Sequence, residues 1–260
     1  MLACDVDLSK LRFPVFCQPK IDGVRAYNNQ GVLYTRNGKL FPNKRIREEF
    51  SKIIYDGYDG EIYDGESFIT TSAKCRTLNG EAEGCVWNLF DRSSIALSTV
   101  NHSYRARFQE PHPVSNYVQI VQSTLISNLI ELKEYFTYHS TEEGIILRST
   151  SACYKEGRST MVDQSLMRWK KFDRETATVT EVLPRMNKYK QELPEVGAFV
   201  CGEFKVSPGV LSREERKRLW ELRNYVVGHV LIYKFADFGS KNKPRFPTFQ
   251  GFEKVVTIRG

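Results

Sequence analysis

The chain has 260 residues, enough for one large domain or two modest ones with their own hydrophobic cores. Its residues are 41% apolar and 12% aromatic, which excludes an intrinsically disordered polypeptide, and its net charge of +7 suits a polyanionic partner. The absence of a membrane-length apolar run, a signal peptide and any CxxC pair among six cysteines predicts an intracellular protein with free thiols and no structural zinc.

A lysine within residues 16–25, FCQPKIDGVR, is the first candidate for chemistry. Lys20 lies between a short apolar run and a glycine turn, so its amine can point into a cleft. Gly23 allows a close approach of the backbone to a ligand or a positive φ, and the Arg25 guanidinium could grip a phosphate at the same turn. A lysine attacks only as the neutral amine, so desolvation or nearby cations would have to lower its pKa. Taken alone, the pattern also fits a surface hairpin with a solvated lysine.

Residues 24–28 and 32–36 alternate around an Asn-Asn-Gln-Gly turn and predict a β-hairpin, whose second arm leads to Arg36. That arginine alone is equally consistent with an ordinary hairpin residue. A helix is predicted next, at residues 44–54, because four apolar residues recur at helical spacing and would face the core: Ile46, Phe50, Ile53 and Ile54.

Two Asp-Gly-Glu triplets follow, ending at Glu61 and Glu66. The first continues as DGEIY (59–63), which reads as a strand, whereas DGESF (64–68) reads as the turn after it. A further apolar strand, CVWNLFD (85–91), contains Phe90. An aromatic residue in such a strand usually packs in the core, although its ring can also stack on a base.

Residues 98–113 are polar and basic and predict a surface loop or a nucleic-acid contact through Arg105 and Arg107. Further along, Glu143 and a glycine precede an apolar strand that ends at Arg148. A carboxylate in that position either opens a buried strand or helps to hold a divalent metal.

The sequence Arg168-Trp169-Lys170 is a predicted strand in which alternation places both cations on one face and Trp169 on the other. Charged residues 173–176 (DRET) then predict a hinge between two domains. Beyond the hinge, short strands and Gly/Pro turns predict a small β-barrel, with strands at 177–184, 197–206 and 225–235 and a helix at 213–223 that Ser212 and Glu215 open as a capping box.

Together, KIDGVR, TRNG, DGEIY, the strand with Phe90, EGIILR and RWK resemble, in order, the motifs of the covalent nucleotidyltransferases, which comprise DNA ligases, RNA ligases and mRNA capping enzymes. The ending KNKPRFPTFQGF resembles that of compact phage- and virus-type ATP-dependent DNA ligases. The resemblance covers nearly the whole chain. It implies an α+β fold, with a nucleotidyltransferase (adenylation) domain of antiparallel sheets and helices at residues 1–173 and an OB-fold β-barrel at 174–260.

The resemblance also implies roles for the residues. Lys20 would accept AMP through a phosphoramidate bond, with Arg25 and Lys170 as further catalytic residues. The nucleotide would be bound by Lys20, Arg25, Glu61, Phe90, Glu143, Arg168 and Lys170. Glu61 and Glu143, preferred over Glu66 and Glu142, would hold Mg²⁺ or Mn²⁺, and Arg36 and Arg148 would bind DNA phosphates. Arg168 departs from the family's lysine: it keeps the positive charge but not the compact ammonium group.

The implied activity is that of an ATP-dependent DNA ligase that seals 5′-phosphate/3′-hydroxyl nicks in duplex DNA in three steps. Lysine adenylylation is followed by transfer of AMP to the 5′-phosphate, and the 3′-hydroxyl then displaces the AMP. The expected partners are ATP and nicked duplex DNA, for a monomer without a membrane partner. Its setting would be DNA repair, replication or recombination, in a host cytoplasm, or in a nucleus if the source is eukaryotic or viral. An N-terminal DNA-binding domain and the zinc cysteines of NAD-dependent ligases are not expected.

Two alternatives remain open at the level of sequence. An RNA ligase or a capping-type guanylyltransferase shares most of the motifs, although EGIILR and the C-terminal segment argue against both. A non-catalytic DNA-binding protein of ligase fold would not be expected to retain Lys20, Glu61 and Glu143. One departure from the family concerns the Arg-x-Asp-Lys motif at the end of the barrel, which is missing; the nearest cation cluster is Lys241, Lys243 and Arg245.

Overall fold

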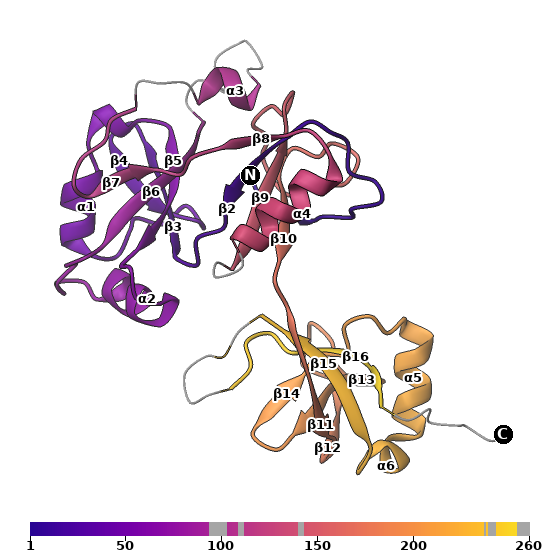
Figure 1. Cartoon of the computed structure of the whole chain (residues 1–260). Coiled ribbons are helices and arrows are strands. Elements are labelled where there is room, and N and C mark those ends of the chain that lie inside the picture. Colours follow the sequence, from indigo (N-terminus) through magenta and orange to yellow (C-terminus); the bar gives the residue numbers. More distant parts are fainter. Residues whose placement is uncertain (94–102, 109–111, 140–142, 237, 239–242, 254–260) are drawn as a thin grey trace. The chain divides into compact units, whose positions relative to one another are not determined.

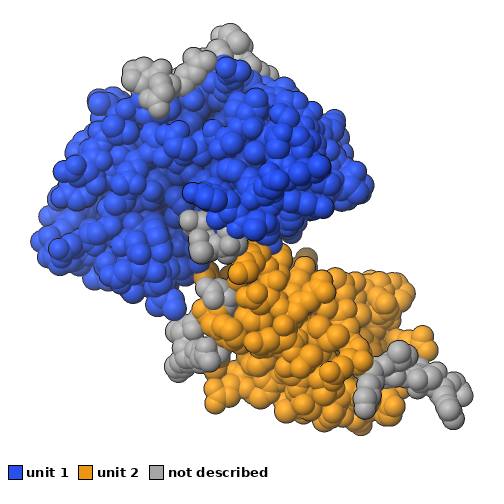
Figure 2. All heavy atoms as spheres, in the orientation of Figure 1, with its two compact units in different colours: residues 1–170 blue, residues 171–260 orange. Residues whose placement is uncertain are grey.

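The computed structural model of the protein describes residues 1–93, 103–108, 112–139, 143–236, 238 and 243–253. The chain divides into two compact units, Met1–Lys170 and Lys171–Gly260 (Figure 2). Each unit contains sheets and helices, so the architecture is α+β, as predicted (Figure 1). Among the described residues, no helix has the length and apolar character needed to cross a membrane.

The first sheet of unit 1 has five strands, which are antiparallel except for β1 beside β10. Their order is β1 (Cys4–Asp5), β10 (Met167–Lys170), β9 (Gly144–Ser149), β2 (Val15–Pro19) and β8 (Thr124–Ile126). Helix α4 (Leu129–Tyr138) starts at Asn128, whose side chain accepts hydrogen bonds from the amides of Ile130 and Glu131. Apolar side chains of this helix pack with one face of the sheet around Leu132, and Phe136 stacks on Trp169. The other face carries the polar side chains of Gln18, Arg148 and Lys170, together with Phe16 and Ile146.

The second sheet of unit 1 also has five strands, and its β3–β4 pair confirms the predicted hairpin. The order is β4 (Val32–Thr35), β3 (Val24–Asn29), β5 (Tyr58–Tyr63), β6 (Val86–Arg92) and β7 (Val118–Ile120). One face packs around Trp87 against side chains of α1 (Lys44–Phe50), η1 (Ile53–Tyr55) and α2 (Phe68–Arg76). A short helix, α3 (Tyr104–Arg107), follows β6.

The helix predicted at 44–54 is shorter than expected. Helix α1 ends at Phe50, and Lys52 is extended, so the chain turns before a single 3₁₀ turn begins. Ile46 and Phe50 are buried as predicted, but Ile53 and Ile54 are 73% and 61% exposed. The prediction that all four face the core was therefore wrong for the last two.

Unit 2 contains two three-stranded sheets, β11-β15-β16 and β12-β13-β14. The strands are β11 (Asp173–Thr178), β12 (Glu181–Met186), β13 (Glu192–Cys201), β14 (Phe204–Val206), β15 (Val230–Phe235) and β16 (Thr248–Phe252). Helix α5 (Arg213–Glu221) begins with the predicted capping box between Ser212 and Glu215, and α6 (Arg223–Val226) follows it. Residues 225–226, expected in a strand, belong to α6.

Two expectations for this unit need correction. The DRET residues expected to form a hinge are the start of β11 and pair with β15, so Lys171 and Phe172 are the connection between β10 and β11. The barrel is not closed in the part of the chain that the structure describes. The two sheets share the bend between β11 and β12, and β14, with three residues, reaches β16 only through an isolated Ser207–Thr248 bridge.

Gly144 is required where β9 begins. Its φ is +140°, and an added Cβ would lie 2.2 Å from the Trp169 carbonyl oxygen. We expect Gly144→Ala to lower the free energy of unfolding by about 2–4 kcal/mol, because both the φ and the contact with β10 become strained. Urea unfolding tests this against Gly157→Ala, which shares a positive φ but has open space around it. Equal losses in the two variants would contradict the steric explanation.

Candidate active site

Three strands of the first sheet bring two lysines to one carboxylate. Lys20 directly follows β2, and its backbone N–H donates to the Gly144 carbonyl at 2.9 Å, while Lys170 pairs with Gly144 across the β9–β10 ladder. Glu143 precedes Gly144, and its two carboxylate oxygens pair with the Nζ atoms of Lys20 and Lys170. The Glu143 carboxylate thus bridges the two ammonium groups. Residues 20, 143 and 170 thus form a compact polar group.

The charge on Glu143 is set by these partners. Burial opposes its ionisation, but Lys20 and Lys170 outweigh that effect and hold the pKa of the Glu143 carboxyl below its usual value. The side chains of the three residues are 11–21% exposed. The carboxylate therefore positions two cations in a site that solvent still reaches.

Arg168 shares a strand face with Lys170, as the alternation predicted, because Met167 and Trp169 belong to the opposite, apolar face. Its Nε donates to Asp5 Oδ1 at 2.6 Å, in a partly exposed pair at the edge of the sheet. Among the described residues, the ion-pair partner of Arg168 is Asp5, whereas that of Lys170 is Glu143. The two cations of this motif thus have different surroundings.

The second sheet contributes a cation and two carboxylates. Arg25 on β3 is opposite Glu61 on β5, so both side chains leave the same face of the sheet. The guanidinium forms a bidentate pair with Asp59, with Nε 2.9 Å from Oδ1, and donates to the Met1 carbonyl at 2.6 Å. Asp59 is 1% exposed, so this pair fixes the orientation of Arg25.

The Glu61 carboxyl interacts electrostatically with Lys20, which follows β2, and with Arg25 on β3. Burial raises the pKa of its carboxyl to about 7, and Lys20 and Arg25 offset that effect only in part. Asp59 and Glu143 push the pKa in the same direction as burial. Gly23 packs against this residue: a Cβ there would lie 2.2 Å from the Ile62 carbonyl oxygen and 2.9 Å from Glu61 Cγ. The glycine of KIDGVR is thus needed for the close approach of the Lys20 turn to β5.

The raised pKa of Glu61 predicts a pH-dependent stability. The folded protein keeps a proton that the unfolded chain releases near pH 4.5, so this contribution to stability is lost as the pH rises from about 4.5 to 7. Glu61→Gln removes the titration. We expect the variant to match the wild type near pH 4.5 and to be more stable by up to about 3 kcal/mol at pH 8. Urea unfolding at both pH values, without ATP or metal, checks this; a gap independent of pH would contradict it.

Phe90 lies outside the core because strand alternation places it on the face opposite the buried Trp87 and Leu89. Asp59 pairs with Asp91 and Gly60 pairs with Leu89, which leaves Phe90 as the extra residue of β6. Its ring lies 5.9 Å from the Arg25 guanidinium carbon and 5.8 Å from that of Arg148. The ring thus lies on the polar face of β6, next to the arginines between the sheets, and the bulge brings Asp91 rather than Phe90 opposite Asp59.

Arg148 links the two sheets and is itself buried. It is 1% exposed, pairs with the Gln18 side chain, and places Nε 3.7 Å from Asp91 Oδ2. Asp91 also accepts from Arg107, at 2.7 Å and 3.0 Å. This enclosure does not support the predicted contact of Arg148 with DNA phosphate. Arg107, expected in a surface loop, is likewise buried at 1% exposure.

Other predicted residues lie apart from this group. Arg36 is exposed in the β4 turn, as is Arg105 on α3, and Glu66 is an exposed turn residue whose amide donates to Asp64. In unit 2, Lys243 pairs with Glu203 at 3.1 Å. Glu142 and Lys241 fall outside the described residues.

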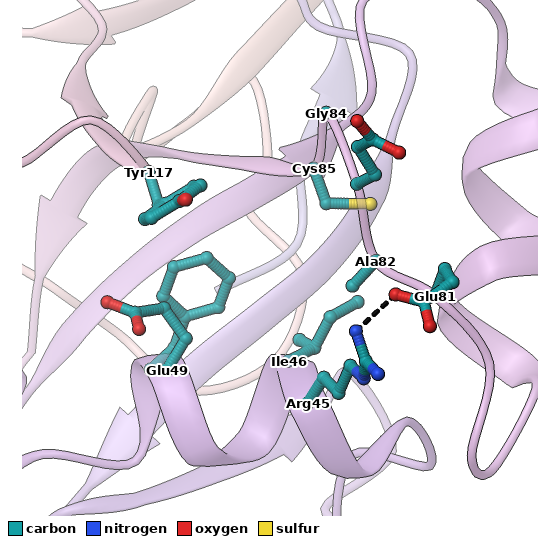
Figure 3. A pocket seen from close by; sticks show the side chains of 10 residues that line it. Arg45, Ile46, Glu49, Glu81, Ala82, Gly84, Cys85 and Tyr117 are labelled. Carbon is teal, nitrogen blue, oxygen red and sulfur yellow. Dashed lines mark hydrogen bonds and ion pairs between the residues drawn. The ribbon is translucent and has the colours of Figure 1, made fainter.

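Unit 1 also has a groove that is separate from these residues (Figure 3). It runs between α1 and residues 81–85, with Arg45 and Glu81 paired across it and Tyr117 at one side. It has no residue in common with the polar group around Lys20. Its charged lining consists of three carboxylates (Glu49, Glu81 and Glu83) and one cation, Arg45, which does not suit a nucleotide.

Sequence reasoning missed the residues that hold the others in place. Asp59 orients Arg25, and Asp91 holds Arg148 and Arg107. Gln18 is buried beside the nucleophile candidate, and its Nε2 donates to the Val121 carbonyl at 2.8 Å. Asp59 and Asp91 do stand within the two strand motifs, DGEIY and CVWNLFD, and a charged residue in an apolar strand was the available signal.

Within the described ranges, no group of three or more His, Cys, Asp or Glu side chains has a geometry suited to a metal ion. Magnesium needs less, because it commonly binds through one or two carboxylates together with substrate phosphates and water. Lys20 and Arg25 offset the raised pKa of the Glu61 carboxyl only in part, so a nearby divalent cation would further stabilise its charged form. The donor set therefore fits a magnesium ion that arrives with phosphates.

Comparison with known proteins gives sequence and structural relatives. No known family profile matches the chain. The sequence is 26% identical over 253 residues to a DNA ligase of Haemophilus influenzae, in an alignment that covers 88% of this chain and 83% of that protein.

Two solved structures share the fold over nearly the whole length. A Lig E DNA ligase has a TM-score of 0.71 at 21% identity, with 96% of this chain and 98% of that chain covered. The Chlorella virus DNA ligase-adenylate has a TM-score of 0.57 at 23% identity, with 98% and 97% covered. The fold of this chain is thus that of the nucleotidyltransferase and OB-fold domains of these proteins, with the open sheets described above in its second unit.

Proposed function

We propose that this chain, a homologue of DNA ligases along most of its length that also has their fold, is an ATP-dependent DNA ligase. Its reaction would seal nicks between a 5′-phosphate and a 3′-hydroxyl in duplex DNA, through a lysyl-AMP intermediate. The observation that carries the proposal is the polar group around Lys20. A lysine amine, a shared carboxylate and a second lysine stand beside Arg25 and Glu61 from the facing sheet.

The first step would be attack by Lys20 Nζ on the α-phosphorus of ATP. A P–N bond forms, the bond between the α-phosphorus and the bridging oxygen breaks, and pyrophosphate leaves. Only a neutral amine can attack, so Lys20 must lose a proton and separate from Glu143. Lys170 shares that carboxylate and is placed to stabilise negative charge on the phosphate as it develops.

The remaining nucleotide contacts follow from side-chain chemistry. Phe90 offers a ring face to the base, between Arg25 and Arg148. Arg25, fixed by Asp59, and Arg168 are cations available to phosphate, and Glu61 is suited to accept a ribose hydroxyl hydrogen bond. Glu61 and Glu143 would hold Mg²⁺, which when bound neutralises charge on the phosphates.

In the second and third steps the AMP would move to a nick 5′-phosphate, with Arg36 as an exposed cation for DNA, and would then be released as the strands join.

The decisive experiment mixes the protein, ATP and Mg²⁺ with a duplex that carries one nick and a labelled 5′-phosphate strand. We expect a joined strand on a denaturing gel, and none when the 5′-phosphate is removed. A parallel reaction with labelled GTP separates the capping-type alternative, and a nicked RNA duplex separates an RNA ligase. Failure to join DNA, together with adduct formation from GTP alone, would contradict the proposal.

A further inference from the structure

Two of the six cysteines meet in the core of unit 1, and both are free thiols. Cys75 lies on α2 and is 1% exposed, and Cys85 directly precedes β6 and is 3% exposed. The two thiols form a hydrogen bond with each other. Two thiols in contact can be converted to a disulfide when two electrons are removed from them.

The strand register and one turn of helix bring these cysteines together. The last pair of the antiparallel β5–β6 ladder joins the end of β5 to the start of β6, so the residues just beyond it, Asp64 and Cys85, are neighbours. Asp64 accepts a hydrogen bond from the Thr71 hydroxyl at 2.8 Å. Thr71 lies one turn before Cys75 on the same face of α2, so that face of the helix is held against the start of β6.

The chain between the cysteines is also fixed by side-chain contacts. Lys74 Nζ pairs with Asp64 at 3.0 Å and donates to the Glu83 carbonyl at 3.1 Å. Asn43 Nδ2 donates to three backbone carbonyls of residues 74–80 at 2.9–3.1 Å. The end of α2 and the start of β6 are thus held together before any bond joins the two sulfur atoms.

Cys85 is the cysteine of the pair that solvent can approach. It lines the groove between α1 and residues 81–85, which has a volume of about 380 Å³ (Figure 3). The hydrogen bond between the thiols raises the pKa of Cys75 and lowers the pKa of Cys85, and Lys74 also lowers the latter. Because the thiolate is the reactive form of cysteine, Cys85 is the expected nucleophile.

We propose that Cys75 and Cys85 form a reversible redox modification site whose substrate is hydrogen peroxide. The Cys85 sulfur attacks one peroxide oxygen: an S–O bond forms, the O–O bond breaks, and the other oxygen leaves as water with the thiol proton. The Cys75 sulfur then attacks Cys85 Sγ: an S–S bond forms, the S–O bond breaks, and a second water carries away the remaining thiol proton. The two sulfur atoms are oxidised to a disulfide and the peroxide is reduced to two water molecules. This site goes beyond the proposed function and does not depend on it.

The disulfide would tie α2 to β6 and close a loop of residues 75–85. Closing such a loop restricts the unfolded chain, so oxidation should lower the equilibrium constant for unfolding of unit 1 about a hundredfold. Urea unfolding of the oxidised and the reduced protein measures this difference.

The test treats the folded protein with hydrogen peroxide, blocks the remaining thiols with iodoacetamide and maps a non-reduced digest by tandem mass spectrometry. We expect one main product, in which Cys75 is joined to Cys85, and we expect dithiothreitol to reverse it. In Cys75→Ala the sulfenic acid on Cys85 has no resolving thiol and should be trapped by dimedone. In Cys85→Ala we expect Cys75 to stay reduced. Cys153→Ala, at a partly exposed cysteine, is the matched control and should form the disulfide as the wild type does.

The mapping of the wild-type protein decides the proposal even if a variant fails to fold. Disulfides that join other cysteines as the main product, or oxidation of Cys4 and Cys153 while Cys85 stays reduced, would overturn it. So would sulfenic acid on Cys75 in folded Cys85→Ala, because the order of the two steps would then be wrong. Absence of ligase activity would leave these results unchanged, so failure of the proposed function is told apart from failure of this inference.

Discussion

Lys20→Ala is expected to abolish the covalent protein–AMP adduct. Alanine has no nucleophile, and Lys20 is the amine that the glycine turn places beside Glu143 and within the field of Glu61. The loss should exceed a thousandfold, because no other group replaces covalent catalysis at this atom. The measurement is transfer of label from [α-³²P]ATP to the protein in the presence of Mg²⁺.

Lys20→Arg distinguishes the loss of the nucleophile from the loss of the positive charge at this position. Arginine retains a positive charge for Glu143 but is not a nucleophile at ordinary pH, because its guanidinium stays protonated. We expect the arginine variant to fold with nearly wild-type stability and to form no adduct. Adduct at wild-type levels in either variant would place the nucleophile elsewhere.

Glu143→Gln should have the second largest effect. The substitution removes the charge that positions the Lys20 and Lys170 ammonium groups, while it keeps the shape of the side chain. It also removes one of the two carboxylates that fit a magnesium ion. We expect adenylylation to slow on the order of a hundredfold or more, as when one charge-stabilising group is removed from a preorganised site.

The matched control is Glu66→Gln, at an exposed carboxylate of the second Asp-Gly-Glu triplet. It should leave the single-turnover rate of adenylylation within about twofold of the wild type, as expected for a surface position. If Glu66→Gln slows the reaction more than Glu143→Gln or Glu61→Gln, the assignment of the carboxylates is wrong. A glutamine variant of Glu143 with normal kinetics would show that the two lysines are positioned by other groups.

The sequence predicted which strands carry the site residues better than it predicted which partners orient their side chains. Alternation around Trp169 correctly placed Arg168 and Lys170 on one face, because strand period depends only on local backbone geometry. The same local pattern did not foresee that Asp59 would orient Arg25, since that pair joins two strands 34 residues apart in the chain. Which carboxylate meets which cation depends on sheet register, and register is a property of the folded sheet.

Phe90 and Arg148 differ in how far the sequence pattern could have placed them. An aromatic residue in an apolar strand usually packs in the core, but Phe90 alternates with the buried Trp87 and Leu89 and so lies among the polar residues. Arg148 stands where the family motif expects a cation for DNA, yet Gln18 and Asp91 enclose it between the sheets. Alternation could therefore have placed Phe90, whereas the buried pair of Arg148 with Asp91 joins two different sheets and leaves no signature in hydrophobic periodicity.

In unit 2, capping chemistry was predictable and sheet closure was not. The Ser212 and Glu215 box forms as expected, because it depends on residues three apart. The hinge expected at 173–176 became part of β11, because those residues pair with β15 some sixty residues later. Charged residues in an exposed strand resemble a linker until the partner strand is known.

The most direct test of the central claim is to locate the adduct. The protein is incubated with ATP and Mg²⁺ in the absence of DNA, digested, and mapped by tandem mass spectrometry under conditions that preserve a phosphoramidate. A single AMP on Lys20, discharged when nicked DNA is added, is the predicted result. AMP on a different lysine, or an AMP on Lys20 that nicked DNA does not remove, would contradict the account.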